Sequence, residues 1–249
     1  MTRNGTEYSY EGRTFHGAVP HIMGTRLEML AVGAPRETVL QVWDWLCEES
    51  SALMSLLDRF DPGSEVSKAN ESGSFTDLSG RLKMLTDLAL SYRERTLGLF
   101  DVFKGGRQLD FGGFAKGYLL KELKTVLEQA GVDCAFIDFG GSSIMAVGHH
   151  PFGESWKVGV RNPFGSDILL EVGLKDRSMS TSGNSPGYSG HIINPLTGLP
   201  VNERKVVTVV ADDPLDAEVL STASMLGDLG MIEKLKEYFP GTRIERFFL

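Results

Sequence analysis

The order of two kinds of hydrophobic spacing constrains the fold of this chain more than any other feature of its sequence. Apolar residues three and four positions apart, typical of a helix, follow Pro35 and continue towards Leu57. Short strand-like segments bounded by glycine and proline fill much of residues 134–174. The two kinds do not alternate in the regular strand, helix, strand order of a doubly wound parallel sheet. We therefore predict the α+β class, with mixed, mainly antiparallel sheets and helices packed on them.

The same patterns give the expected elements. Helices are predicted from Pro35 towards Leu57 and over residues 79–95, 115–130, 214–227 and 231–238. Strands are predicted over residues 25–32, 134–138, 143–147, 156–161, 168–174, 206–211 and 242–249. Residues 59–74 are rich in Pro, Gly, Asn and Ser and predict a long ordered loop. Long loops in compact domains are usually functional or disordered.

Composition excludes several classes of function. With 249 residues, 41% hydrophobic and 23% charged, the chain is typical of a folded globular protein. No linker divides it, so we predict an N-terminal extension over residues 1–20 and a single domain over residues 21–249. The net charge of −8 argues against nucleic-acid binding as the main activity, because such binding needs clustered basic residues that neutralise phosphates. No apolar run suits a membrane span, and the polar first residues contain no signal region, so we expect a cytoplasmic protein, with an exported location as the alternative if a leader was removed. Cys47 and Cys134 are expected to be separate core thiols.

A glycine-rich segment is the first candidate binding element. Residues 109–118 read Leu-Asp-Phe-Gly-Gly-Phe-Ala-Lys-Gly-Tyr and stand directly before a segment with helical spacing. Paired glycines let backbone approach a ligand, and the amides at a helix N-terminus attract an anion such as a diphosphate. Lys116 would add a positive charge to the same phosphates. The segment also fits a simple glycine turn with a solvated lysine, and its spacing is neither that of a P-loop nor of a Rossmann fingerprint.

Two further polar regions contain candidates for acid–base or metal chemistry. Residues 180–184 and 190–198 supply hydroxyls and unshielded amides, and His191 is a candidate proton acceptor near neutral pH. Glu218 and Thr222 are four residues apart on a predicted helix, where a carboxylate and a hydroxyl on one face suit a hard divalent cation. Taken alone, His191 also fits a structural role, and the other pair also fits an ordinary solvated helix face.

Six motifs in order resemble the ApbE family, flavin transferases that move FMN from FAD onto a protein threonine or serine. They are Met23-Gly24-Thr25, Ser-Glu-Val-Ser-Lys-Ala-Asn at 64–70, Asp-Phe-Gly-Gly-Phe-Ala-Lys-Gly at 110–117, Phe139-Gly140-Gly141, Ser182-Gly183 with 191–198, and Leu-Ser-Thr-Ala at 220–223. The resemblance covers roughly residues 20–230. It implies an ApbE-like, T-fold-like domain that transfers FMN from FAD to a Thr or Ser of an acceptor flavoprotein, depends on Mg²⁺ and releases AMP.

The resemblance also implies roles for individual residues. The residues that it assigns to FAD are Met23, Phe60, Leu99, Phe100, Asp101, Asp110, Lys116, His191 and Thr197. Those that it assigns to the metal are Gly113, through its carbonyl, with Glu218, Ser221 and Thr222. Met23 and Phe60 would lie against the flavin or adenine, and Asp110 and Lys116 would hold the adenosine or diphosphate. His191 would assist the transfer and is the expected catalytic residue.

The chain also departs from the family pattern at several positions. The family's metal aspartate, four residues before the threonine, is Glu218 here, and the aspartate of its His-Ile-Ile-Asp-Pro motif is Asn194. Ser142 follows the glycine pair where the family often has Asp or Asn, and the segment from Asp101 to Asp110 is short. Two alternatives therefore stay open. One is an FAD pyrophosphatase that yields FMN and AMP, and the other is a non-enzymatic FAD-binding protein with a degenerate metal site.

Overall fold

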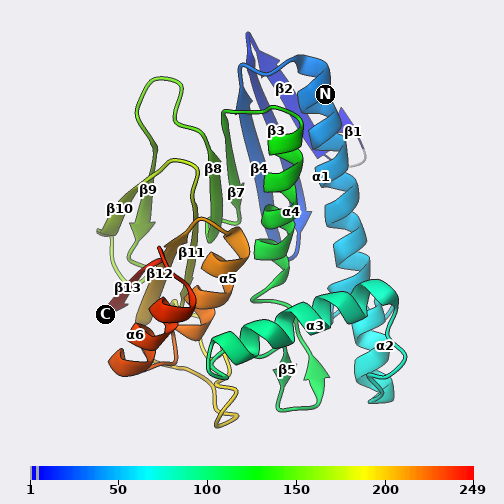
Figure 1. Ribbon diagram of the computed structural model, residues 1–249, viewed down its shortest axis with the longest axis vertical. Coiled ribbons are helices and arrows are strands. Elements are labelled where there is room, and N and C mark those ends of the chain that lie inside the picture. Colours follow the sequence, from blue (N-terminus) through cyan, green and yellow to red (C-terminus); the bar gives the residue numbers. More distant parts are fainter. Residues whose placement is uncertain (1, 4–5) are drawn as a thin grey trace.

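A sheet of nine strands forms the centre of the molecule (Figure 1). The computed structural model describes residues 2–3 and 6–249. In spatial order the strands of this sheet are β1 (Thr2–Arg3), β2 (Thr6–Glu11), β3 (Thr14–Ile22), β4 (Thr25–Val32), β7 (Ala135–Phe139), β8 (Ser143–Val147), β11 (Ser178–Gly183), β12 (Lys205–Ala211) and β13 (Arg243–Phe248). Each neighbouring pair within these described residues is antiparallel. The two hairpins outside this sheet are β9 (Trp156–Arg161) with β10 (Ile168–Leu174), and β5 (Phe103–Lys104) with β6 (Gln108–Leu109).

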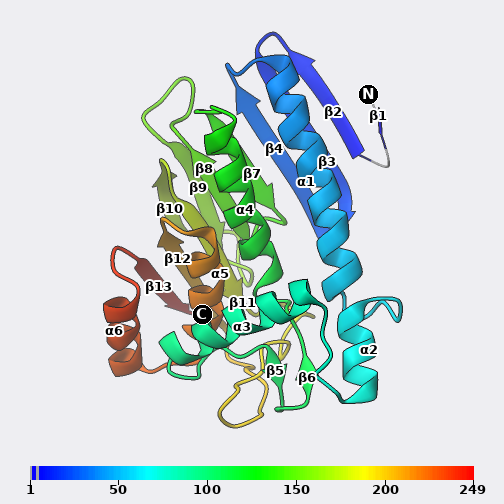
Figure 2. The ribbon, with the colours of Figure 1, turned by 45° about the vertical axis from the view of Figure 1, so that its right-hand side comes forward.

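The helices of the described residues are α1 (Arg36–Leu57), α2 (Glu65–Ser72), α3 (Gly80–Arg95), α4 (Ala115–Gln129), α5 (Pro214–Ala223) and α6 (Leu229–Tyr238). Of these, α1, α4 and α5 cover one face of the sheet and bury the main core against it, while α2 and α3 lie at its lower end (Figure 1). Figure 2 shows α1, α4 and α5 side by side against the sheet, in agreement with the contacts of α4 with both neighbours. Their apolar stripes pack on inward-facing strand residues, among them Trp43 of α1 and Phe15 of β3, whose ring centroids are 5.5 Å apart. Burial of such apolar area is the main driving force for this layer.

The opposite face of the sheet is partly covered by the β9–β10 hairpin. Strand β8 is buried along its whole length because alternate residues face different layers. Met145 and Val147 join the main core, whereas Ile144 packs in a second apolar cluster with Trp156. Strand β12 is buried on both faces in the same way. These strands of the antiparallel sheet are apolar along their length because the helices cover one face of the sheet and the β9–β10 hairpin covers part of the other.

Most expected elements are present, and the α+β class is confirmed. The strands predicted at 25–32, 143–147, 156–161 and 168–174 coincide with β4, β8, β9 and β10, and the five predicted helices correspond to α1, α3, α4, α5 and α6. The predicted loop over 59–74 is wrong in part, because α2 lies within it. Ser64 caps that helix by accepting from the Ser67 N–H, and Gly73 ends it in a left-handed conformation. Only Val66 and Ala69 of α2 are buried, and two apolar positions are too few to predict a helix from hydrophobic spacing.

The N-terminal strands and β11 are further elements that spacing did not reveal. Residues 6–22 pair into the central sheet, so a boundary at residue 20 falls inside β3. Gly17 of β3 is packed so closely that an added Cβ would lie 2.8 Å from ring atoms of Phe15 and Trp43. Cys47 and Cys134 are both free thiols, but each is only partly buried and not in the core as predicted, and burial raises the pKa of Cys47 to about 11. Within the described residues no helix is long and apolar enough to cross a membrane.

Candidate functional site

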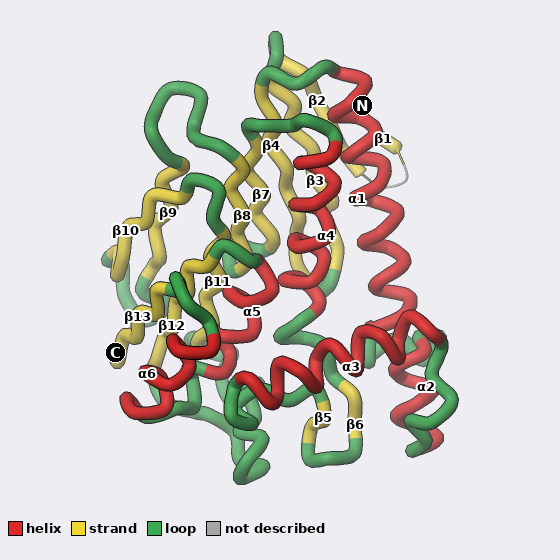
Figure 3. Tube along the Cα trace, in the orientation of Figure 1, coloured by secondary structure: helices red, strands yellow, loops and turns green. Residues whose placement is uncertain are grey.

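A cavity of about 660 Å³ lies where the glycine turn before α4, one face of α5 and the residues after β11 meet. Figure 3 shows the irregular connection between β11 and β12 and the β5–β6 hairpin at the same lower end of the molecule. This volume is in the range of small-molecule sites. The cavity is lined by these sequence-predicted residues: Met23, Phe60, Leu99, Phe100, Asp101, Asp110, Gly113, Lys116, His191, Glu218 and Thr222.

Thr197 and Ser221 are predicted site residues that do not line the cavity. Thr197 is exposed in a turn, where its hydroxyl accepts a hydrogen bond from the Leu199 N–H at 3.3 Å. Ser221 is fully buried on α5, and its hydroxyl lies 2.8 Å from that of Ser182. Ser221 also donates to the Glu218 carbonyl, so it supports the wall from behind. The structure therefore separates these two residues from those whose side chains face the cavity.

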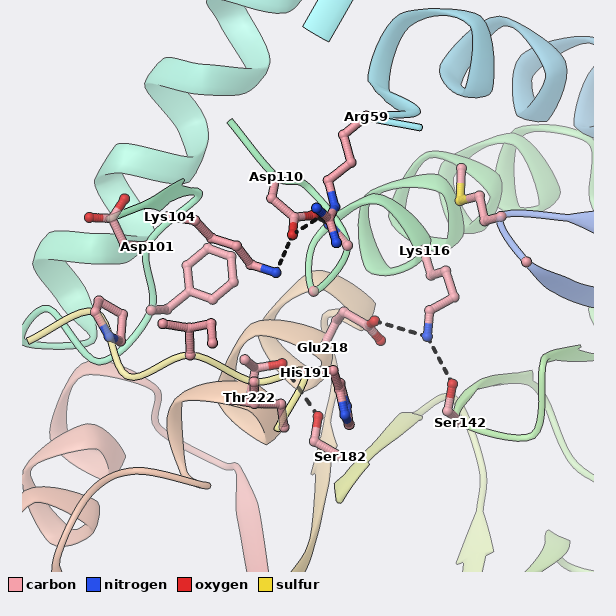
Figure 4. A pocket seen from close by; sticks show the side chains of 18 of the residues that line it. Arg59, Asp101, Lys104, Asp110, Lys116, Ser142, Ser182, His191, Glu218 and Thr222 are labelled. Carbon is pink, nitrogen blue, oxygen red and sulfur yellow. Dashed lines mark hydrogen bonds and ion pairs between the residues drawn. The ribbon is translucent and has the colours of Figure 1, made fainter. Parts of the chain in front are cut away.

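Glu218 is a buried carboxylate that has partners at both of its oxygens, two hydrogen bonds at one and an ion pair at the other. It is 4% exposed, and its Oε2 accepts hydrogen bonds from the hydroxyls of Ser143 at 2.6 Å and Ser180 at 2.9 Å. The Lys116 Nζ lies 3.2 Å from its Oε1 and also donates to the Ser142 hydroxyl at 2.8 Å (Figure 4). A buried charge needs such pairing and hydrogen bonding to be tolerated. Ser143 was not predicted, because a single hydroxyl in a strand gives no distinct sequence signal, whereas Ser180 belongs to the predicted polar region 180–184.

Close packing of α4 against α5 brings Lys116 to Glu218. A Cβ on Gly117 would lie 2.5 Å from the Glu218 Cβ and 3.0 Å from the Pro214 carbonyl oxygen. Only glycine fits at such a distance. The N-cap position of α4 is Phe114, which supplies no side-chain hydrogen bond to the first amides of the helix. Those amides and Lys116 together favour an anionic ligand at this end of the cavity.

The oxygen donors near Glu218 fit a hard divalent cation. Thr222 lies one helical turn after Glu218, and a Cβ on Gly113 would lie 3.1 Å from its hydroxyl oxygen, so the Gly113 backbone is adjacent. Carboxylate, hydroxyl and carbonyl oxygens suit Mg²⁺, which commonly takes one or two carboxylates together with substrate phosphates. The described residues contain no group of three or more His, Cys, Asp or Glu side chains placed to hold a metal. A cation here would therefore share Glu218 with Lys116.

His191 has the environment of a neutral imidazole. Its ring stacks on that of Tyr188, with centroids 4.1 Å apart. Its Nδ1 is buried and has no hydrogen-bond partner among the described residues. Burial and the nearby positive charge of Lys104 lower the pKa of His191 from its ordinary value. The ring is thus predominantly uncharged near neutral pH and able to accept a proton.

Asp110 and Asp101 line the cavity and each forms ion pairs with basic side chains. Asp110 Oδ2 lies 3.2 Å from Arg59 Nε and also contacts Lys104. Asp101 pairs with Arg93 at 3.1 Å. Arg59 and Lys104 line the cavity but were not predicted. The Gly105-Gly106 pair was an available signal, because two glycines between short extended segments favour a tight hairpin.

Comparisons with known proteins identify the family of the chain and the fold that it shares. The model of the ApbE family matches residues 102–242. A Klebsiella pneumoniae (strain 342) protein named FAD:protein FMN transferase is 31% identical over 157 residues, which are 59% of this chain and 47% of that protein. A Treponema pallidum (strain Nichols) protein of the same name is 34% identical over 158 residues, covering 55% of this chain and 43% of that protein. The chain thus spans slightly less than half the length of these curated relatives.

Solved structures show the same fold at lower sequence identity. Flavin transferase ApbE from Vibrio cholerae matches with a TM-score of 0.77 and 18% identity, covering 98% of this chain and 94% of that chain. The apo form of the flavinyl transferase ApbE from Pseudomonas stutzeri matches with a TM-score of 0.78 and 20% identity, covering 100% of this chain and 93% of that chain. The family model covers more than half of the described sequence and includes the glycine turn, His191 and Glu218. This chain belongs to the ApbE family.

Proposed function

We propose that this chain transfers the FMN part of FAD to a Thr or Ser hydroxyl of an acceptor protein and releases AMP. The main support is one cavity that combines the uncapped N-terminus of α4, Lys116, a neutral His191 and the oxygen donors of Glu218 and Thr222. An anion-binding end beside a proton acceptor is what transfer of a nucleotide phosphoryl group requires. The names of the curated relatives support the transfer of FMN from FAD to a protein.

The reaction assigns a separate task to each side chain. The α4 amides and Lys116 bind the diphosphate, and the acceptor hydroxyl is placed near His191. The acceptor oxygen bonds to the FMN phosphorus, the bond from that phosphorus to the bridging oxygen breaks, and AMP leaves with that oxygen. His191 takes the proton of the hydroxyl. Mg²⁺ held by Glu218, Thr222 and the Gly113 carbonyl would offset negative charge on the phosphoryl oxygens.

A second candidate is an FAD-binding protein without transfer activity. The ion pair between Lys116 and Glu218 favours it, because the ammonium group already neutralises the carboxylate that would bind a metal. In that case FAD would bind through Lys116 and the α4 amides and remain intact. Metal and FAD would then bind independently, whereas a shared cation makes each ligand tighten the other by the same factor.

One incubation separates these functions and the FAD pyrophosphatase alternative. The purified chain is mixed with FAD and Mg²⁺, with and without Thr- and Ser-containing acceptor peptides, and products are followed by mass spectrometry and nucleotide chromatography. We expect a flavinylated peptide and one AMP for each peptide modified. Free FMN with AMP in equal amounts, whether or not peptide is present, would identify a hydrolase. Unchanged FAD would support the binding protein.

A matched pair of histidine variants tests the proposed proton acceptor. His191→Ala should retain FAD binding and lower turnover by roughly 10²- to 10⁴-fold, the usual contribution of a positioned base. His149 lies on an exposed loop and does not line the cavity, so His149→Ala is the control and should keep wild-type turnover. Equal turnover in both variants would contradict the assignment of His191.

A further inference from the structure

Two basic side chains of the cavity wall share one carboxylate. Arg59 Nε lies 3.2 Å from Asp110 Oδ2, and the Lys104 amino group contacts the same oxygen. The other oxygen of Asp110 accepts the Gly112 N–H at 2.8 Å. Figure 4 shows the two basic side chains reaching Asp110 from different segments of the chain. One negative charge therefore faces two positive ones at this part of the wall.

The other carboxylates of the wall are matched one to one. Glu218 pairs with Lys116 and Asp101 pairs with Arg93. Arg93 itself does not line the cavity, so the positive charge is local: Arg59, Lys104 and Asp110 together carry a net charge of +1. This surplus occurs in a protein whose net charge is −8, and a local field of opposite sign to the whole molecule indicates a site for an anion.

Both cations are held in place before any ligand binds. Lys104 ends β5 and is followed by Gly105 and Gly106, which have φ of 59° and 69°, and the Arg107 N–H bonds the Lys104 carbonyl at 3.2 Å. Positive φ at both central residues is the geometry of a tight hairpin turn that suits glycine. Arg59 is held by its ion pair with Asp110, and its guanidinium carbon lies 4.2 Å from the centroid of the Phe60 ring. Preorganised groups lose little freedom on binding.

The cluster also lies between two hollows. Arg59, Lys104 and Asp110 line the main cavity and a second cavity of about 170 Å³. The wall of the second cavity is fixed by Asn70, which donates to the Leu109 carbonyl at 2.9 Å and accepts from the Leu109 N–H at 2.7 Å. Arg59 and Lys104 are therefore accessible to a ligand from both cavities.

We propose that Arg59 and Lys104 bind a phosphate of the substrate diphosphate, as a second cationic subsite beside Lys116 and the α4 N-terminus. The assignment rests on the proposed function, since FAD supplies that diphosphate. The guanidinium offers planar paired donors to phosphate oxygens, and the ammonium adds a point charge. Asp110 then has a positioning role, because it fixes both cations while leaving the cluster with a net positive charge.

Calorimetry with three probes tests the subsite. FAD and ADP contain a diphosphate, and riboflavin contains no phosphate. Arg59→Gln and Lys104→Gln should each weaken FAD and ADP by about 10- to 100-fold, the loss expected for one charge-assisted bond, and should leave riboflavin nearly unchanged. Arg107→Gln is the control on the same hairpin, because Arg107 is exposed and lines neither cavity. It should bind all three probes as the wild type does.

Two further measurements keep the assignment falsifiable if a variant folds poorly. Lys104→Arg preserves the charge and should restore most of the ADP affinity lost in Lys104→Gln. ADP binding by the wild-type protein should weaken as salt rises, because ionic interactions are screened. An ADP affinity that is absent, independent of salt, or unchanged in both glutamine variants would overturn the subsite, as would an equal loss for riboflavin.

Failure of the subsite is distinguishable from failure of the proposed function. If wild-type protein flavinylates the acceptor peptide while both glutamine variants bind ADP normally, the subsite alone is wrong. If wild-type protein binds ADP through these residues but leaves FAD intact, the transferase function is wrong and the anion site stands.

Discussion

At the scale of single residues, Glu218 shows how a longer side chain is accommodated. Its carboxylate is bonded by Ser143, Ser180 and Lys116, so the extra methylene is taken up by contacts within the chain. An aspartate at the same backbone position would reach less far. The three contacts explain how a glutamate can be buried here at 4% exposure.

Replacing Glu218 tests its link to the metal. Glu218→Gln removes the charge at nearly constant volume, so we expect the fold to persist, the free energy of unfolding to fall by about 1–3 kcal/mol, and the response to Mg²⁺ to disappear. Glu218→Asp should keep that response. Turnover is measured in Mg²⁺ and in EDTA, with thermal unfolding as the check on folding. Equal turnover in EDTA and Mg²⁺ for the wild type would remove the metal from the proposed reaction.

His191 gives a prediction about pH. Burial and Lys104 lower its pKa from the ordinary value of 6.5, so the proton acceptor is active above its pKa and is lost as pH falls through it. The acid limb of kcat/KM should therefore lie below pH 6.5, and Lys104→Gln should move it upwards towards that value. Protonation also favours the unfolded state, so His191 contributes less stability as the pH falls below about 6.5. A pH profile unchanged by Lys104→Gln would contradict this coupling.

At the scale of elements, the close packing of α4 against α5 sets the shape of the cavity, because it brings Lys116 and Glu218 together. Gly117→Ala would place a methyl 2.5 Å from the Glu218 Cβ, so the helices must separate and Lys116 must shift. We expect a loss of about 1–3 kcal/mol in unfolding free energy together with weaker FAD binding, measured by denaturant titration and calorimetry.

A second glycine on an exposed helix start provides the control. An added Cβ on Gly80, in the first turn of α3, meets no atom within 4 Å. Gly80→Ala should leave FAD binding unchanged and change stability by less than about 1 kcal/mol, because alanine is the better helix former. Similar losses of binding in both variants would argue against the helix contact as the cause.

At the scale of the whole molecule, an antiparallel sheet with helices on one face gathers distant segments at one end. Met23 follows β3, Lys104 ends β5, Lys116 lies in the first turn of α4 and Glu218 lies on α5, yet all four line one cavity. Because β2 and β3 extend the same sheet, the N-terminal residues support the wall that bears Met23. The charge of the whole molecule is negative, whereas Arg59, Lys104 and Asp110 together carry a local net positive charge, so anion binding depends on local arrangement and not on net charge.

The sequence alone determined the long helices, the apolar strands and the motif residues of the cavity. These depend on local periodicity and on glycine and capping residues, which are visible within a short window, as for α1, β8 and the turn before α4. Sequence spacing missed β2, β3 and β11, because their alternation is weak and they are extended mainly through pairing with neighbours. It also did not predict Arg59, Lys104 and Ser143, and it gave Ser180 only as one of several hydroxyls near a ligand and not as a partner of Glu218. Their role depends on which carboxylate each meets across the fold, and only tertiary packing decides such contacts.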